Sequence, residues 1–175
     1  MVVPPNLFPW LKSGTMSRYP NFNIRPYFTS DAEQTARVFH DAVHIGATRF
    51  YSEAQRQAWA PEIPKPPLWG ARLANTTTMV AEKNNQILGF MSLTGAGMLD
   101  MAYVAPAAMG MGVADELYEE IVHIANSRDL VALGTEASFM ARRFFLKQGW
   151  REITEQVIER NGVELTNFLM AKYLK

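Results

Sequence analysis

Residues 98–114 combine a short apolar segment with a glycine-rich turn that could hold an anion. The segment Met98–Val104 is typical of a buried strand, and Pro106 follows it. After it come Gly110 and Gly112, whose missing side chains let backbone N–H groups approach a ligand closely. The helix predicted next would offer unpaired N–H groups and a favourable dipole to that ligand. These residues predict either a cradle for a phosphate or pyrophosphate, or a tight strand-to-helix connection without a ligand.

The elements that would position this turn follow from the hydrophobic pattern of the whole chain. Seven segments are typical of strands: 23–28, 77–82, 86–94, 98–104, 130–134, 151–159 and 163–173. Apolar residues at helical spacing predict helices up to His44, before Pro61, near 68–73, after Gly112 and up to Gln148. This order implies an α+β fold with a mixed, mostly antiparallel sheet of about seven strands and helices on both faces.

Short polar motifs predict where several elements begin or turn. The Ser-Asp-Ala-Glu motif at 30–33 and the Ser-Glu-Ala-Gln motif at 52–55 predict capping boxes, in which two side chains satisfy exposed N–H groups at a helix start. The pairs Asn-Asn at 84–85 and Asn-Gly at 161–162 each separate two strand-like segments. Such pairs favour tight hairpin turns, so both connections are expected to join adjacent antiparallel strands.

The composition narrows the class of protein. Seventeen basic and seventeen acidic residues cancel, which gives no indication of a nucleic-acid or membrane-surface partner. The chain has no cysteine, which excludes disulfides, thiolate metal sites and cysteine nucleophiles. Histidines and carboxylates do not gather at metal-ligand spacing, and no apolar run approaches the ~18 residues of a membrane span. We expect a cytoplasmic protein without metal, nucleic-acid or membrane partners.

The chain divides into an irregular N-terminal extension over residues 1–21 and one domain over 22–175. The extension contains the apolar residues Leu7, Phe8 and Trp10, and prolines interrupt it. Its apolar side chains would pack on the domain or on a neighbouring molecule, so a homodimer is one expectation. One alternative function is therefore an interaction domain that uses this N-terminal arm.

Two motifs in this order resemble the GNAT superfamily of acetyl-CoA-dependent N-acetyltransferases, over about residues 22–175. Residues 104–106 read Val-Ala-Pro and residues 109–114 read Met-Gly-Met-Gly-Val-Ala, similar to the family's signature Gln/Arg-x-x-Gly-x-Gly/Ala after a strand ending in Val-x-Pro. Met109 stands where the family has Gln or Arg. Residues 141–150 read Ala-Arg-Arg-Phe-Phe-Leu-Lys-Gln-Gly-Trp, similar to a second family feature, Ala-x-x-Phe-Tyr-x-x-x-Gly-Phe.

The resemblance implies a binding site for acetyl-CoA as cosubstrate. The strands at 98–104 and 130–134 would splay apart, with the pantetheine arm in the gap and the pyrophosphate on backbone N–H groups of 109–114. The helix at 141–150 would lie near the nucleotide end. The cofactor-binding residues implied are Met101, Ala102, Tyr103, Val104, Met109, Gly110, Met111, Gly112, Val113, Ala114, Ser138, Ala141, Arg142 and Phe145.

Acetyl transfer to an amine requires that the amine lose its proton, because a free alkylamine with a pKa of about 10.4 is mostly protonated at neutral pH. The candidates for the general base are Asp100, Glu136 and His44, and Tyr51 is a candidate acid or substrate clamp. Each has a structural alternative. Asp100 could be a solvent-facing carboxylate, Glu136 could cap the following helix, and His44 could bond at a helix end.

The pocket for the acceptor amine is predicted from the position of Asp100 and from two tryptophans. Strand alternation would place Asp100 on the same sheet face as Ala102 and Val104. Trp59 and Trp69 fall in the region that shapes the acceptor pocket in the family. They would form an aromatic wall for a small amine, or serve core packing alone.

The function predicted from these residues and the resemblance is an N-acetyltransferase. It would move the acetyl group of acetyl-CoA directly to a primary amine of a small molecule or peptide, in a ternary complex. The lack of cysteine excludes a cysteinyl acetyl-enzyme. In many family members a tyrosine at the position of Phe145 protonates the leaving thiolate, which phenylalanine cannot do. The alternative is therefore a non-catalytic acyl-CoA-binding regulatory module.

Overall fold

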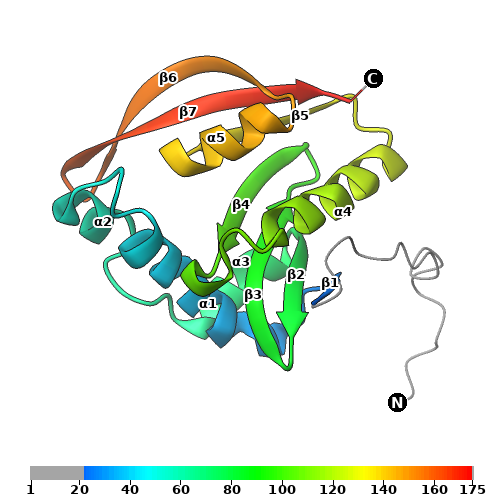
Figure 1. The fold of residues 1–175 in the computed structure, drawn as a ribbon, viewed down its shortest axis with the longest axis horizontal. Coiled ribbons are helices and arrows are strands. Elements are labelled where there is room, and N and C mark those ends of the chain that lie inside the picture. Colours follow the sequence, from blue (N-terminus) through cyan, green and yellow to red (C-terminus); the bar gives the residue numbers. More distant parts are fainter. Residues whose placement is uncertain (1–21, 175) are drawn as a thin grey trace.

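The structure is a computed structural model that describes residues 22–174 (Figure 1). The strands are β1 (Asn23–Pro26), β2 (Thr77–Lys83), β3 (Gln86–Leu93), β4 (Met98–Val104), β5 (Ala132–Ala137), β6 (Arg151–Arg160) and β7 (Val163–Tyr173). The α-helices are α1 (Ala32–Asp41), α2 (Glu53–Trp59), α3 (Pro66–Ala74), α4 (Val113–Ser127) and α5 (Phe139–Lys147). Short helical turns η2 (Thr29–Asp31), η3 (Ala42–Gly46) and η4 (Pro106–Ala108) connect them.

The strands form one mixed sheet that opens in its middle. Their order is β1-β2-β3-β4-β5-β7-β6, and every pair is antiparallel except β4 and β5. The parallel pair is joined only where Met98 faces Gly134 and Leu99 faces Thr135. Beyond these positions the two strands separate, and β5, β6 and β7 form a second wing above β4 (Figure 1). The predicted α+β sheet with a splayed central pair is confirmed.

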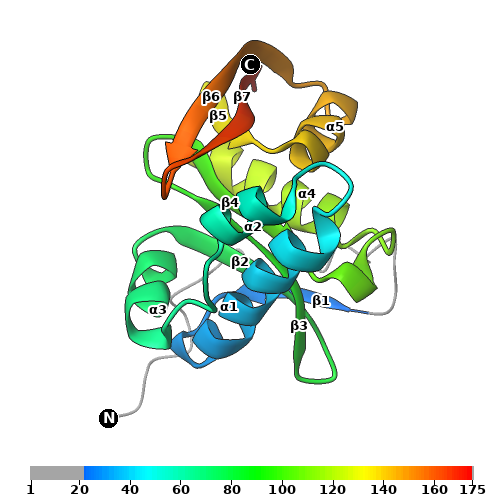
Figure 2. The same ribbon diagram turned by 90° about the vertical axis from the view of Figure 1, so that its left-hand side faces the viewer.

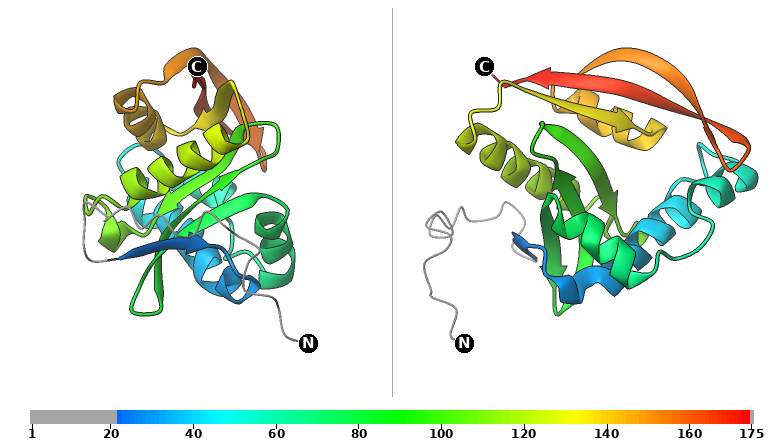
Figure 3. Two further views of the ribbon diagram at one scale, coloured as in Figure 1. Left: turned by 90° about the vertical axis from the view of Figure 1, so that its right-hand side faces the viewer. Right: turned by 180° about the vertical axis from the view of Figure 1, so that it is seen from behind.

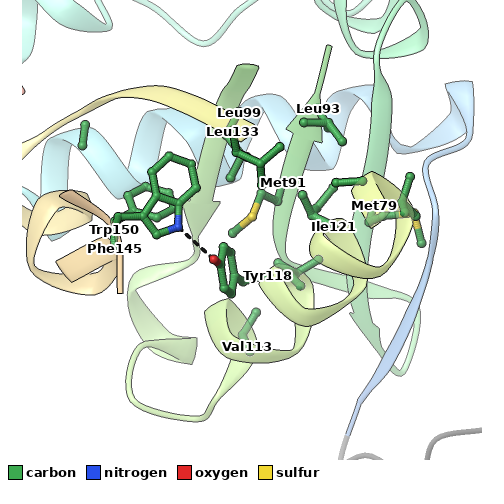
Figure 4. Close-up of a cluster of buried hydrophobic side chains, with 14 of the residues drawn as sticks. Met79, Met91, Leu93, Leu99, Val113, Tyr118, Ile121, Leu133, Phe145 and Trp150 are labelled. Carbon is green, nitrogen blue, oxygen red and sulfur yellow. Dashed lines mark hydrogen bonds between the residues drawn. The ribbon is translucent and has the colours of Figure 1, made fainter. Parts of the chain in front are cut away.

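Helices cover both faces of this sheet, as predicted. The helices α4 and α5 lie on one face, where Ile121, Tyr118 and Trp150 belong to a common apolar core (Figure 4). In that core the Trp150 indole N–H donates a hydrogen bond of 2.8 Å to the Tyr118 hydroxyl. The helices α1 and α3 cover the opposite face (Figure 3, right). Phe39 and Trp69 are buried in the core on that side. The β4 strand therefore runs between two packed layers, at the point where the sheet opens.

Three of the local motifs take the predicted form. The Ser52 hydroxyl accepts from the N–H of Gln55 at 3.2 Å, and the Gln55 side chain accepts from the N–H of Ser52 at 3.0 Å, which is the capping box at the start of α2. Both residues of the turn at 84–85 and both of the turn at 161–162 have positive φ values. This is the geometry of the tight hairpin turns that Asn-Asn and Asn-Gly favour.

The capping box predicted at 30–33 is wrong. The side chain of Asp31 accepts from the N–H of Phe28 at 2.8 Å, and Asp31 also pairs with the Arg25 guanidinium of β1 at 2.7 Å. Glu33 instead forms an ion pair with Arg37 one turn along α1. Asp31 fixes the start of the helix because Arg25 of β1 holds its carboxylate. The Ser-Asp-Ala-Glu motif does not include Arg25, so it could not predict this contact.

The strand predicted at 130–134 lies two to three residues further along the chain, at Ala132–Ala137. The Thr135 hydroxyl donates to the carbonyl oxygen of Leu99 at 2.9 Å and is buried in the sheet, so Thr135 does not cap α5. Ser138 is the cap, and its hydroxyl accepts from the N–H of Ala141 at 3.2 Å. Glu136 therefore belongs to β5 and is not a helix cap.

The predicted extension at 1–21, with its apolar arm, lies outside the described residues. Within residues 22–174, no helix combines the length and the apolar character needed to cross a membrane. The same residues hold no group of three or more potential metal ligands.

Candidate active site

Two cavities adjoin β4 and share part of their walls. The first, here named the glycine-loop cavity, has a volume of about 490 Å³ and is lined by β4, residues 108–117 and α5. The second, here named the polar cavity, has a volume of about 450 Å³ and is lined by residues of α2, α3, β4 and the β5–β7–β6 wing. Figure 2 shows how these elements are arranged. Trp59, Tyr103 and Ser138 line both cavities. Groups bound in the two cavities can therefore meet beside these three side chains.

The glycine-loop cavity presents free backbone donors. Gly110 and Gly112 have φ values of 79° and 81°, in the left-handed region that favours glycine. Gly112 is the N-cap of α4, and the first hydrogen bond of that helix joins the N–H of Glu116 to its carbonyl. The N–H groups of Gly110 and of residues 112–115 are thus left without a partner in the described part of the chain. Unpartnered donors at a helix N-terminus are the arrangement that an anion cradle requires.

Most residues predicted to bind the cofactor line this same cavity. They are Ala102, Tyr103, Val104, Met109, Gly110, Gly112, Val113, Ala114, Ser138, Ala141 and Phe145. Met101 lines the polar cavity instead, while Met111 and Arg142 line neither. Because β4 and β5 pair only at two positions, the β4 edge beside residues 101–104 has no strand partner from β5.

Positive charge near the glycine-loop cavity comes from two residues of α5. Arg143 and Lys147 are among its lining residues. The guanidinium of Arg142 is directed elsewhere: it pairs with Glu152 of β6 and lies 4.6 Å from the centre of the Phe168 ring. Asp115 also lines the cavity, and its carboxylate accepts a hydrogen bond of 2.9 Å from Gln148.

A β-bulge at Asp100 decides what faces the polar cavity. Ser92 of β3 faces Met101, but the next residue, Leu93, faces Leu99, so Asp100 is an extra residue on β4. The predicted shared face with Ala102 and Val104 is therefore wrong. The bulge breaks strict alternation, and Asp100 turns toward α3, on the face opposite to the one under α4.

Asp100 is held by an arginine that the sequence did not indicate. The Arg72 guanidinium of α3 makes three contacts of 3.0 to 3.2 Å with the Asp100 carboxylate. Both side chains line the polar cavity, with exposed fractions of 55% and 31%. Since the two charges offset each other, Asp100 is a poor candidate for a free base.

Glu136 has a different environment. It lies on β5 directly after Thr135, the last residue of β5 that pairs with β4, and it lines the polar cavity. Its carboxylate has no cationic partner in the described residues, and the side-chain hydrogen bond it forms there is a long one of 3.4 Å, donated by the Asn167 amide. Glu136 is therefore a carboxylate beside the opening of the sheet that has no counter-charge among the described residues.

Tyr51 and His44 have structural contacts. The Tyr51 hydroxyl donates to the carbonyl of Thr166 at 2.9 Å and accepts from the N–H of Phe139 at 3.3 Å, so it ties β7 to the start of α5. Burial raises the pKa of Tyr51, and the Phe139 contact partly opposes the shift. Tyr51 lines the polar cavity, whereas His44 lines neither cavity and bonds through Nε2 to the Ala60 carbonyl at 2.7 Å.

Tyr103 lies where the two cavities meet. Its ring packs against Phe39 and Phe90 of the α1-covered face. Burial raises its pKa to about 12, while a hydrogen bond from Trp59 and the charges of Arg160 and Arg72 oppose the shift. The phenol is therefore neutral at physiological pH. The resemblance predicted only a backbone role for Tyr103, so its side chain is an addition to the site.

Phe145 is buried in the core under α4. It is 1% exposed and its ring packs against Tyr118 and Trp150 (Figure 4). It also lines the glycine-loop cavity. The position that carries a tyrosine in many GNAT enzymes thus faces the same cavity here without a hydroxyl group.

Comparison with known proteins agrees with this geometry. Residues 40–173 match the family described as an acetyltransferase (GNAT) domain. The chain is 33% identical over 150 residues to an uncharacterized N-acetyltransferase, YafP, of Escherichia coli (strain K12), which covers 86% of this chain and 95% of the relative.

Solved structures share the fold. A GCN5-related N-acetyltransferase from Rhodopseudomonas palustris, described also as a class-II aminotransferase, superposes with a TM-score of 0.82 at 32% identity over 87% of this chain and 96% of its own. The PaiA N-acetyltransferase from Thermoplasma acidophilum, in complex with coenzyme A, superposes with a TM-score of 0.69 at 16% identity, over 87% of this chain and 99% of its own. The family match spans most of the chain and includes the splayed strands that both cavities adjoin. The chain belongs to the GNAT acetyltransferase family and is an acyltransferase.

Proposed function

We propose that this enzyme transfers the acetyl group of acetyl-CoA directly to a primary amine, in a ternary complex. The observation that carries the proposal is the meeting of the two cavities at Trp59, Tyr103 and Ser138. A donor bound on one side of β4 and an acceptor bound on the other would have their reacting groups at that junction. Proximity of this kind can supply a large part of a rate enhancement.

The glycine-loop cavity fits acetyl-CoA, which would supply an activated acetyl group. The N–H groups of Gly110 and residues 112–115, which have no partner within residues 22–174, suit a pyrophosphate, and Arg143 and Lys147 add positive charge. The β4 edge at 101–104 has main-chain groups available for an extended amide-containing arm. The side chain of Met109 adds no charge, so the backbone carries most of this recognition.

Glu136 is the general base in this proposal. Of the candidate bases, Asp100 is neutralised by Arg72 and His44 lies outside both cavities. Glu136 accepts the proton that the acceptor ammonium must lose before its nitrogen can form the new N–C bond, as the C–S bond breaks. Proton transfer of this kind typically contributes a factor of about 10² to 10⁴.

The leaving sulfur needs a partner other than Phe145. Tyr103 lines both cavities and its hydroxyl is protonated, so it can donate a hydrogen bond to charge that develops where the cavities meet. Its pKa of about 12 lies well above the value of about 8.5 for an ordinary thiol, so full proton transfer from Tyr103 is unfavourable. We assign that proton to water and the stabilising contact to Tyr103.

Calorimetric titration with acetyl-CoA, followed by measurement of thiol release with a panel of primary amines, tests the proposal. We expect one binding site per chain and amine-dependent release of CoA. Failure to bind acetyl-CoA at concentrations far above the micromolar range would overturn the proposal. Binding without thiol release across a broad amine panel would instead favour the regulatory module.

A further inference from the structure

We propose that the acceptor is a long amine with a carboxylate at its far end. Glu136 and Asn167 would bind the amine, and Arg160 would bind the carboxylate. This inference rests on the proposed function, and it names the class of substrate. The polar cavity contains two groups of opposite charge, Glu136 and Arg160, that lack a counter-charge in the described residues. The other charged pair in its wall, Arg72 with Asp100, is already complete.

The amine end is formed by Glu136 and Asn167. Asn167 is 9% exposed, lines the cavity and gives only a 3.4 Å contact from its Nδ2 to the Glu136 carboxylate. Its Oδ1 is buried without any hydrogen-bond partner in the described residues. Buried polar atoms in folded proteins are nearly always bonded, so an unpartnered acceptor requires an explanation. An ammonium group carries three donors and no acceptor, and it satisfies both the free Oδ1 and the carboxylate.

The anionic end is Arg160, the last residue of β6. Its side chain lines the cavity and forms no ion pair with a carboxylate of the described chain. It lies close enough to Tyr103 for its charge to act against the rise that burial causes in the pKa of that phenol. A guanidinium binds a planar carboxylate through two parallel hydrogen bonds, and one free arginine matches one negative charge. These properties favour a carboxylate over a doubly charged phosphate.

The strand register sets the spacing between the two ends. On β7, Glu136 faces Leu169 and Arg160 faces Val163, six residues apart. At about 3.3 Å per residue, the two positions are about 20 Å apart along β7, and one strand spacing on each side of β7 adds to the distance between their backbones. The two side chains shorten this gap. Between them, Ile158 and Leu165 line the cavity from paired positions. An acceptor with an apolar or extended middle section and charges at both ends matches this row.

A matched set of ligands tests the anionic end. Hexylamine, 1,6-diaminohexane, 6-aminohexanoate and 8-aminooctanoate share an amine and differ in the far group or in length. We expect the CoA-loaded enzyme to bind at least one amino acid of this set about tenfold more tightly than hexylamine in calorimetry, and 1,6-diaminohexane least tightly. We expect the same order in kcat/KM from thiol release. Equal binding of the carboxylates and hexylamine would overturn the inference.

Variants at the two ends of β6 separate recognition from general charge. Arg160→Gln should make the affinities for 6-aminohexanoate and hexylamine nearly equal. Arg151→Gln, at the opposite end of the strand, should preserve the wild-type ratio of the two affinities. Asn167→Leu should weaken 6-aminohexanoate more than hexanoate, which lacks the amine. A ratio that survives Arg160→Gln would overturn the assignment of that end.

The two proposals fail in different ways. A binding preference for the amino acids without any thiol release would support the acceptor site and would count against transferase activity. Thiol release with every amine at equal efficiency would support the transferase and overturn the acceptor class.

Discussion

The glycine-loop cavity and the polar cavity lie against the same strand but are built in different ways. The first presents backbone N–H groups from one stretch, 110–115, and an edge of β4 that β5 leaves unpaired. The second relies on side chains that come from α2, α3, β4, β5, β6 and β7. Backbone recognition tolerates side-chain changes and can be seen in a short motif. Recognition by scattered side chains depends on each of them and is set by the fold.

The sharpest test of this difference is a change of one side chain in the polar cavity. We expect Glu136→Gln to lower kcat about 1,000-fold, because the amide cannot accept the proton of the acceptor ammonium. The affinity for acetyl-CoA should remain that of the wild type. Steady-state thiol release and calorimetry measure the two quantities. Asp100→Asn is the comparison variant, and a larger loss there than at Glu136 would transfer the role of base to Asp100.

The backbone site should respond to charge placed in it. Ala114 lines the glycine-loop cavity in the first turn of α4, so Ala114→Glu introduces a carboxylate beside the expected pyrophosphate. We expect about a 100-fold loss of acetyl-CoA affinity by repulsion at short range. A carboxylate at a helix N-terminus favours the helix, so folding should be unaffected. Ala114→Gln has the same size without the charge, and an equal loss in that variant would show that bulk, not charge, is responsible.

The conformation of the loop can be tested with a pair of glycines. Gly110 and Gly162 have φ values of 79° and 75°, and a Cβ added at either meets no atom within 4 Å. Alanine at each should cost a similar strain of about 1 kcal/mol in unfolding free energy. Only Gly110→Ala should weaken acetyl-CoA, by about tenfold, because its methyl group enters the space beside the free N–H groups. Equal affinities of the two variants for acetyl-CoA would contradict a ligand at this loop.

Tyr103, where the two cavities meet, should have a smaller effect, which is on the free energy of unfolding at alkaline pH. The pKa of Tyr103 is raised from 10.0 to about 12, chiefly by burial. As the pH rises from about 10 to about 12, the unfolded chain releases this proton first, so the free energy of unfolding should fall. Urea unfolding of wild type and Tyr103→Phe near pH 9 and near pH 11 measures the difference. The variant should lose less stability, and equal losses would show that Tyr103 is not buried in this way.

A feature of this fold can be predicted from sequence when the residues that form it are neighbours in the chain. The hairpins at 84–85 and 161–162 and the glycine turn at 110–112 are predicted because each depends on a local pattern of turn residues. The splayed pair of strands in the sheet is predicted from the family resemblance, not from a local pattern. The capping box predicted at 30–33 is wrong, because Arg25 on a neighbouring strand recruits Asp31. Local patterns succeed wherever neighbours in sequence supply the partner.

The side-chain cavity shows the limit of that reasoning. Arg72 lies 28 residues from Asp100, and Asn167 lies 31 residues from Glu136, yet each pair is in contact. The bulge that turns Asp100 toward α3 is a mismatch between two strands, which alternation within one strand does not reveal. Arg160 carries no motif of its own, and only the register of β6 on β7 brings it into the wall.

Backbone amide hydrogen exchange with and without acetyl-CoA tests the central claim most directly. The N–H groups of Gly110 and residues 112–115 have no partner within the described chain, so they should exchange fast in the free protein. Saturation with acetyl-CoA should slow their exchange strongly, with weaker protection along 101–104, and should leave the hairpin at 161–162 unchanged. Binding of acetyl-CoA with no protection at 110–115 would contradict the division of the site into a backbone half and a side-chain half.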